Sequence, residues 1–190
     1  MDSMVGEQRL VKDVARERDT NPVELMIDLS LKTDFNQFFC QPAANENQEH
    51  VLEMMKHPRS VVTFSDSGAH VSQIMDSSLQ THLLSHWVRE KEAMTLEEAV
   101  RELTCVPATH WGMHDRGLIR EGLNADLVVF DPETVAPRMP EVVNDLPSGA
   151  KRLKQVASGI RHSIVNGEVF LTDNEHTGST SGRLFRGRVS

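Results

Sequence analysis

The first third of the chain alternates helical periodicity with short apolar runs. Residues 5–31 carry apolar side chains at helical spacing, with a restart at Asn21-Pro22. There Asn21 suits an N-cap and Pro22 the first residue of the second helix. Another helix is expected from residue 45 to His57, because the proline that follows disfavours helical geometry in the residue before it.

Two apolar runs between these helical stretches have the composition of strands. Residues 35–40 are aromatic, and residues 61–64 are Val-Val-Thr-Phe. The second run suits a strand buried on both faces, as in a parallel sheet covered by helices. This strand–helix–strand order predicts an α/β architecture.

The pattern changes along the second half of the chain. A helix is expected over residues 79–89, and Thr95 with Glu98 forms the capping box of the next one. Beyond residue 115 the chain becomes rich in glycine, with strands predicted at 127–130 and 160–165. Asn166-Gly167 then indicates a type I′ hairpin turn. Residues 115–175 therefore look like a β-rich segment, followed by a polar tail over 176–190.

Composition and charge exclude several classes of function. The net charge is −8, whereas a nucleic-acid surface needs a basic patch. No apolar run approaches the roughly 18 residues of a membrane span. The two cysteines, Cys40 and Cys105, lack the spacing of a disulfide framework or zinc finger, which favours reduced thiols and a cytoplasmic protein.

The strongest candidate for chemistry is Asp66, which closes the apolar run at 61–64. α/β folds place their chemistry at the carboxyl ends of such strands, where a carboxylate can bind a metal or carry a proton. The alternative is an aspartate that caps the next helix. His70 lies four residues on, where it could contact a substrate or simply stabilise its loop. His82 and His86 have a spacing known from zinc sites, but no glutamate stands between them in the H-E-x-x-H order.

Several stretches together resemble a known family. The motif at 64–70 (FSDSGAH), Thr81–Leu84 and 96–100 (LEEAV) look like the last barrel segment of the metal-dependent amidohydrolases. The motif at 122–131 (GLNADLVVFD) resembles the strand by which that chain enters its small β domain. Together with Val165-Asn166-Gly167, they are similar to the N-acyl-D-amino-acid deacylase (D-aminoacylase) branch.

The resemblance implies a fold, a reaction and a set of residues. Residues 1–114 would form the last strands and helices of a (β/α)8 barrel, and residues 115–175 part of a β-sandwich. The enzyme would hydrolyse the amide of a small N-acyl amino acid with zinc and a water molecule. Asp66 would be the general base and acid, and also a candidate metal ligand. Ser67, Gly68 and His70 would bind substrate.

The sequence departs from the family at its metal ligands. It has no H-x-H pair, and only His50 and His57 precede Asp66. A whole barrel takes about 250 residues, yet the expected last strand begins at residue 61. We therefore expect the carboxyl-terminal part of a longer hydrolase, inactive and without zinc as an isolated chain. Two alternatives stay open: an inactive binding or assembly module, for which an open sheet edge would favour homo-oligomers, and a cyclic-amidase or dihydroorotase-like hydrolase.

Overall fold

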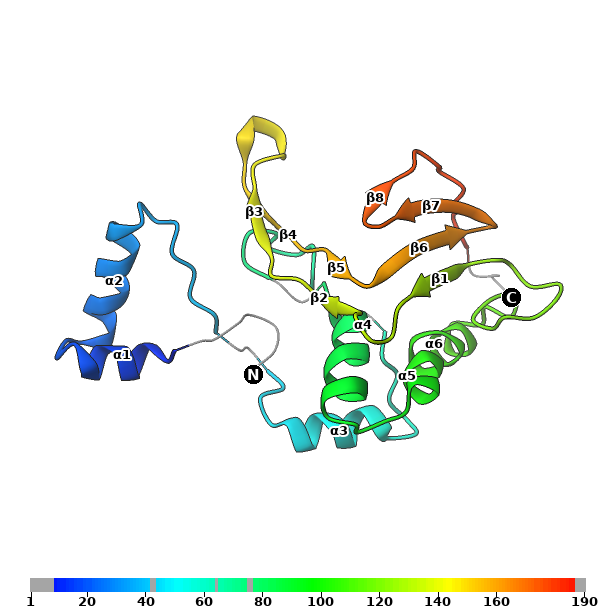
Figure 1. The fold of residues 1–190 in the computed structure, drawn as a ribbon, viewed down its shortest axis with the longest axis horizontal. Helices are drawn as coiled ribbons and strands as arrows, with labels where there is room; N and C mark the ends of the chain where they lie inside the picture. Colours follow the sequence, from blue (N-terminus) through cyan, green and yellow to red (C-terminus); the bar gives the residue numbers. More distant parts are fainter. Residues whose placement is uncertain (1–8, 42–43, 64, 75–76, 187–190) are drawn as a thin grey trace. The chain divides into compact units, whose positions relative to one another are not determined.

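The computed structural model describes residues 9–41, 44–63, 65–74 and 77–186 of the 190-residue chain (Figure 1). The chain divides into two compact units, Met1–Glu53 and Met54–Ser190. We describe each unit by itself. No described helix is long and apolar enough to cross a membrane.

The first unit is helical. Helices α1 (Val11–Glu17) and α2 (Pro22–Lys32) pack on each other and bury Ala15 and Leu25. The predicted restart is confirmed, because Asn21 Oδ1 accepts the backbone N–H of Val23 at 2.8 Å and Pro22 is the first helical residue. Helix α3 (Gln48–Lys56) spans the boundary between the units and confirms the helix expected there.

The strands expected before the C-terminal half are not formed. Residues 36–40 have no regular secondary structure, and neither do residues 61–63; Phe64 lies outside the described residues. Within the described part of the chain, the first strand begins at Leu127. The physical reason is that a strand exists only through hydrogen bonds to a neighbouring strand, and no described segment pairs with either run.

The second unit has a helical part with one helix of unexpected type. Helix α4 (Leu79–His82) continues into a π-helix, η1 (Leu83–Glu90), whose side chains Leu83, Leu84 and Trp87 are buried. The helix predicted at 79–89 is confirmed in place. Helices α5 (Leu96–Leu103) and α6 (Cys105–His110) follow.

The capping box predicted for α5 is confirmed. The Thr95 hydroxyl accepts the Glu98 N–H at 3.2 Å, and the Glu98 carboxylate accepts the Thr95 N–H at 2.8 Å. Two otherwise unpaired backbone donors of the first turn are thereby satisfied.

The β-rich part of the second unit is antiparallel. A four-stranded sheet has the order β1 (Leu127–Phe130), β6 (Ile160–Val165), β7 (Glu168–Thr172), β8 (Glu175–His176). The predicted turn between β6 and β7 is confirmed, since Asn166 and Gly167 both have the positive φ of a type I′ turn, 50° and 82°.

Two short pairs complete the strands. Strand β2 (Ala136–Pro137) pairs with β5 (Ala157–Ser158), and β3 (Glu141–Val143) pairs with β4 (Arg152–Lys154). A short 3-10 helix, η2 (Pro147–Gly149), joins β3 to β4. Figure 1 shows this pair as a narrow ribbon, drawn in yellow, that extends away from the four-stranded sheet.

Part of the C-terminal segment, expected as a polar tail, contacts the sheet. Asn166 donates its side-chain amide to the Ser181 carbonyl at 2.6 Å, and the Ser181 hydroxyl donates to the Val165 carbonyl at 2.8 Å. Further on, the Phe185 ring lies 3.9 Å from the guanidinium of Arg116. Arg116 is itself paired with Asp126 at 2.5 Å, so this segment closes over a partly buried ion pair.

Candidate functional site

Asp66 lies in a turn-rich loop that leads from residues 61–63 toward α4. Its side chain is exposed, and its backbone carbonyl accepts the Ala69 N–H at 3.1 Å. This bond closes a tight turn that contains Gly68, whose φ is +94°. A methyl group at Gly68 would meet no atom within 4 Å, so the turn calls for glycine because of its backbone angle and not because of space.

The other predicted site residues lie on the same loop. The Ser65 and Ser67 hydroxyls are 2.7 Å apart, and the Ser67 N–H donates to the Ser65 hydroxyl at 3.3 Å. His70 is exposed and has φ +47°, an uncommon angle for a residue other than glycine. Asp66, Gly68 and His70 are thus exposed, and Ser67 is half-buried.

A distant part of the second unit supports this loop. Strand β4 donates the Leu153 N–H to the Val71 carbonyl at 2.8 Å. Just beyond β4, the Gln155 amide accepts the Ser77 hydroxyl at 3.2 Å. Neither hydrogen bond could be predicted from the sequence. Each joins residues 78 or more positions apart, and no local sequence pattern indicates such a contact.

The described residues do not supply a zinc site. Among them, no three His, Cys, Asp or Glu side chains form a group that could hold a metal ion. One carboxylate at Asp66 is short of the three protein ligands of a catalytic zinc. A metal at this site would need ligands from outside the described residues.

His82 and His86 form a buried stack instead. Their rings lie 4.8 Å apart and are nearly parallel, at 11°, and His86 Nδ1 is 3.2 Å from the carboxylate of Glu90. Nδ1 of His82 is buried and finds no hydrogen-bond partner among the described residues. Burial, and secondarily the neighbouring His86, lowers the pKa of His82 to about 4. His82 therefore packs in the helix as a neutral imidazole.

This stack predicts a loss of stability in mild acid. The unfolded chain titrates His82 near its usual pKa of about 6.5, so between pH 6.5 and about 4 the unfolded state binds the extra proton. We expect the free energy of unfolding to be highest above pH 6.5, where His82 is neutral in both states. It should fall by about 1–2 kcal/mol toward pH 4, after allowing for partial solvent screening. Urea unfolding at pH 7.5 and 5.0 measures it, and a His82→Gln variant should lose this part of the pH dependence. If the unfolding free energy of that variant fell as much between pH 7.5 and 5.0 as that of the wild type, the pH dependence would come from other groups.

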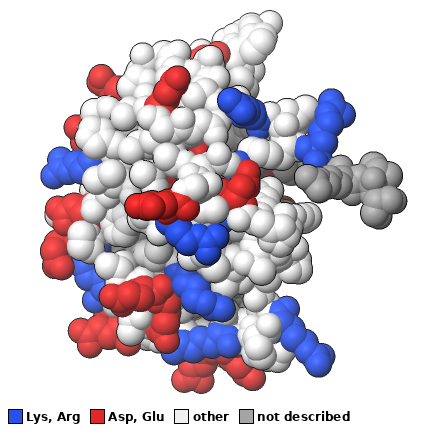
Figure 2. All heavy atoms as spheres, turned by 90° about the vertical axis from the view of Figure 1, so that its right-hand side faces the viewer, with Lys and Arg blue, Asp and Glu red and all other residues white. Residues whose placement is uncertain are grey.

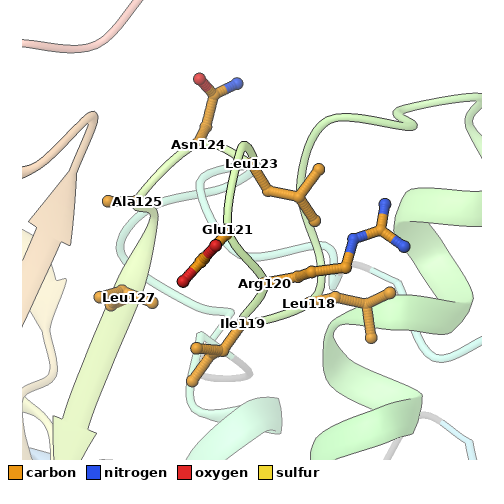
Figure 3. A pocket seen from close by; sticks show the side chains of 8 residues that line it. All are labelled: Leu118, Ile119, Arg120, Glu121, Leu123, Asn124, Ala125 and Leu127. Carbon is orange, nitrogen blue, oxygen red and sulfur yellow. The ribbon is translucent and has the colours of Figure 1, made fainter.

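One hollow on the described surface is lined by residues other than Asp66. It measures about 340 Å³ and is formed by the loop that leads into β1 (Figure 3). Its lining combines apolar Leu118, Ile119, Leu123 and Leu127 with Arg120, Glu121, Asn124 and Ala125. Ile119 is almost fully exposed, so the hollow is open to solvent and does not enclose a ligand. On the face in Figure 2, basic and acidic side chains are interspersed and form no continuous basic patch.

Comparison with known proteins assigns the family. A model of the amidohydrolase family matches residues 2–170. Two curated relatives come from Alcaligenes xylosoxydans xylosoxydans. N-acyl-D-glutamate deacylase is 42% identical over 87 residues, or 46% of this chain, and N-acyl-D-aspartate deacylase is 29% identical over 167 residues, or 87% of this chain. A solved structure of D-aminoacylase, described for its binuclear metal center, is 25% identical over 94% of this chain with a TM-score of 0.57.

The chain is a mixed α/β protein that belongs to the amidohydrolase family. Within that family it is similar to the N-acyl-D-amino-acid deacylases, which confirms the predicted resemblance to this branch. The matched region covers 16% and 28% of the two curated relatives and 34% of the solved D-aminoacylase chain. The chain thus spans about a third or less of the proteins it matches.

Proposed function

We propose that this chain is a segment of a metal-dependent amidohydrolase that releases free amino acids from N-acyl-D-amino acids. The observation that carries the proposal is the 42% identity with N-acyl-D-glutamate deacylase. Support from the structure comes from Asp66, an exposed carboxylate on a turn that is held from a second element. Small N-acyl amino acids are the substrates, and the enzyme is cytoplasmic.

Asp66 has the chemical properties that amide hydrolysis requires. A water oxygen bonds to the amide carbon and the C–N bond breaks, so one proton must leave the water and one must reach the departing nitrogen. A single carboxylate in reach of both can accept the first and donate the second. Ser67, Gly68 and His70 follow Asp66 on the same loop and would contact the substrate.

In this proposal the complete enzyme supplies the zinc ligands and the neighbouring barrel strands. We propose zinc as its cofactor, held by ligands that lie outside the described residues. Residues 61–64 would gain neighbouring strands there and form a strand of a (β/α)8 barrel, with residues 1–114 in the barrel. Residues 115–175 would form part of a β-sandwich, and 176–190 the tail behind it.

Zinc content and amide hydrolysis, measured on two proteins, test this proposal. The complete enzyme should bind zinc and release amino acid from N-acetyl-D-glutamate, with little release from the L-enantiomer. The 190-residue chain alone should bind less than one zinc per ten chains and show no turnover. Hydrolysis of dihydroorotate but not of N-acetyl-D-amino acids would favour the cyclic-amidase alternative. Absence of all hydrolysis from the complete, zinc-loaded protein would favour the binding module.

A further inference from the structure

The loop that carries Asp66 has a strained backbone at His70. The hydrogen bonds inside the loop join only residues close together in sequence. His70 has φ +47°, an angle that costs a residue with a side chain about 1 kcal/mol. The internal bonds run from Ala69 N–H to the Asp66 carbonyl, and from the Gln73 and Ile74 N–H groups to the His70 carbonyl. Strain of this kind persists only where surrounding structure holds it.

The surrounding structure is the end of the β3–β4 ribbon. Leu153 N–H donates to the carbonyl of Val71, the residue directly after strained His70, at 2.8 Å. Two residues further along the chain, the Gln155 side-chain amide both accepts and donates a hydrogen bond. Its Oε1 accepts the Ser77 hydroxyl at 3.2 Å, and its Nε2 donates to the Arg138 carbonyl at 2.8 Å. One amide thus ties Ser77 to the base of the ribbon.

Strand pairing and one two-point ion pair hold the ribbon together. Strands β3 and β4 pair over three residues each, and Arg152 binds both carboxylate oxygens of Asp145 at 2.6 Å. Such two-point pairing fixes orientation as well as distance. At its base, the Arg138 N–H donates to the Val156 carbonyl at 2.9 Å, next to Gln155.

We propose that Gln155 is a positioning residue of the hydrolase, which together with β4 holds the Asp66–His70 loop in its reactive conformation. The inference rests on the proposed function of Asp66. Gln155 binds Ser77, strand β4 binds Val71 through the Leu153 N–H, and neither contacts the substrate in this proposal. Small displacements of a catalytic group lower the rate steeply, so the effect of losing this support falls on turnover.

Kinetics and hydrogen exchange on the complete enzyme test the proposal. Gln155→Ala should lower kcat about 10-fold with KM nearly unchanged. Amide exchange of residues 66–74 should become about 5–10-fold faster, the factor expected for one lost hydrogen bond, while exchange of the β1 and β6 amides stays at the wild-type rate. Ser77→Ala should reproduce both effects. The double variant should be no worse than Gln155→Ala, because Gln155→Ala already removes the bond to Ser77.

Gln80→Ala is the matched control, since Gln80 lines the same hollow of about 100 Å³ as Ser77 and Gln155. It should leave kcat and loop exchange unchanged. A Gln155→Ala variant with wild-type kcat and wild-type exchange of the loop amides would overturn the inference. Faster exchange spread evenly over the sheet would also overturn it, because that result indicates a general loss of stability. If Asp66→Asn turned over normally, the proposed function would fail, but the exchange of residues 66–74 would still report whether Gln155 holds the loop.

Discussion

Replacing Asp66 with asparagine should lower kcat of the complete enzyme about 1,000-fold, within the range that general acid–base catalysis contributes. Asparagine keeps the size and polarity of the side chain, but its amide accepts no proton from water and returns none to the leaving nitrogen. Because the side chain is exposed on a turn, the substitution should leave the fold intact. Release of amino acid from N-acetyl-D-glutamate measures turnover.

Zinc content separates two roles of Asp66. We propose that Asp66 carries the proton while other residues hold the metal, so the variant should keep most of its zinc, measured by atomic emission. Asp28→Asn, an equivalent change on the exposed surface of α2, should be as active as wild type. Normal turnover in Asp66→Asn would refute the catalytic role, and loss of zinc together with turnover would make Asp66 a required ligand.

Local signals in the sequence predicted local structure well. The Asn21 cap, the Thr95–Glu98 box and the Asn166-Gly167 turn each involve atoms within a few residues of one another. Their free energies depend on neighbouring side chains and backbone angles that the sequence states directly. For the same reason the strands on either side of that turn were placed correctly.

Long-range structure was less accessible. The runs at 35–40 and 61–64 have strand-like composition, but composition cannot supply the partner strands that hydrogen bonding requires. The π-helix was also unforeseen. It is marked by bonds such as that from Lys91 N–H to the His86 carbonyl, five residues back, and packing of Leu83, Leu84 and Trp87 accompanies it.

The candidate site also combines local features, which the sequence predicts, with long-range contacts, which it does not. Asp66 became the candidate because its carboxylate follows an apolar run and precedes a glycine, all within a few residues. The hydrogen bonds that hold its loop come from Leu153 and Gln155, which the fold brings near from far along the chain. Motifs therefore point to the proposed reactive group, while the residues that we propose to position it are visible only in the structure.

Gly159 marks a place where the fold tolerates no side chain. It lies between β5 and β6 with φ +74°, and its carbonyl accepts the Asp131 N–H at 2.8 Å. A methyl group there would collide with the backbone nitrogen of Val135 and come within 2.6 Å of its Cα. Val135 is itself 1% exposed, so the backbone it belongs to has no room to retreat.

Gly159→Ala should therefore destabilise the second unit by about 3 kcal/mol or more, as the sum of backbone strain and overpacking. Gly167→Ala is the matched control, because Gly167 has a similar φ of +82° but open space around it. It should cost about 1 kcal/mol, from strain alone. Native-state hydrogen exchange of the β1 and β6 amides measures both losses. Equal losses in the two variants would mean that the chain relaxes around residue 159, and that close packing against Val135 is not what requires glycine.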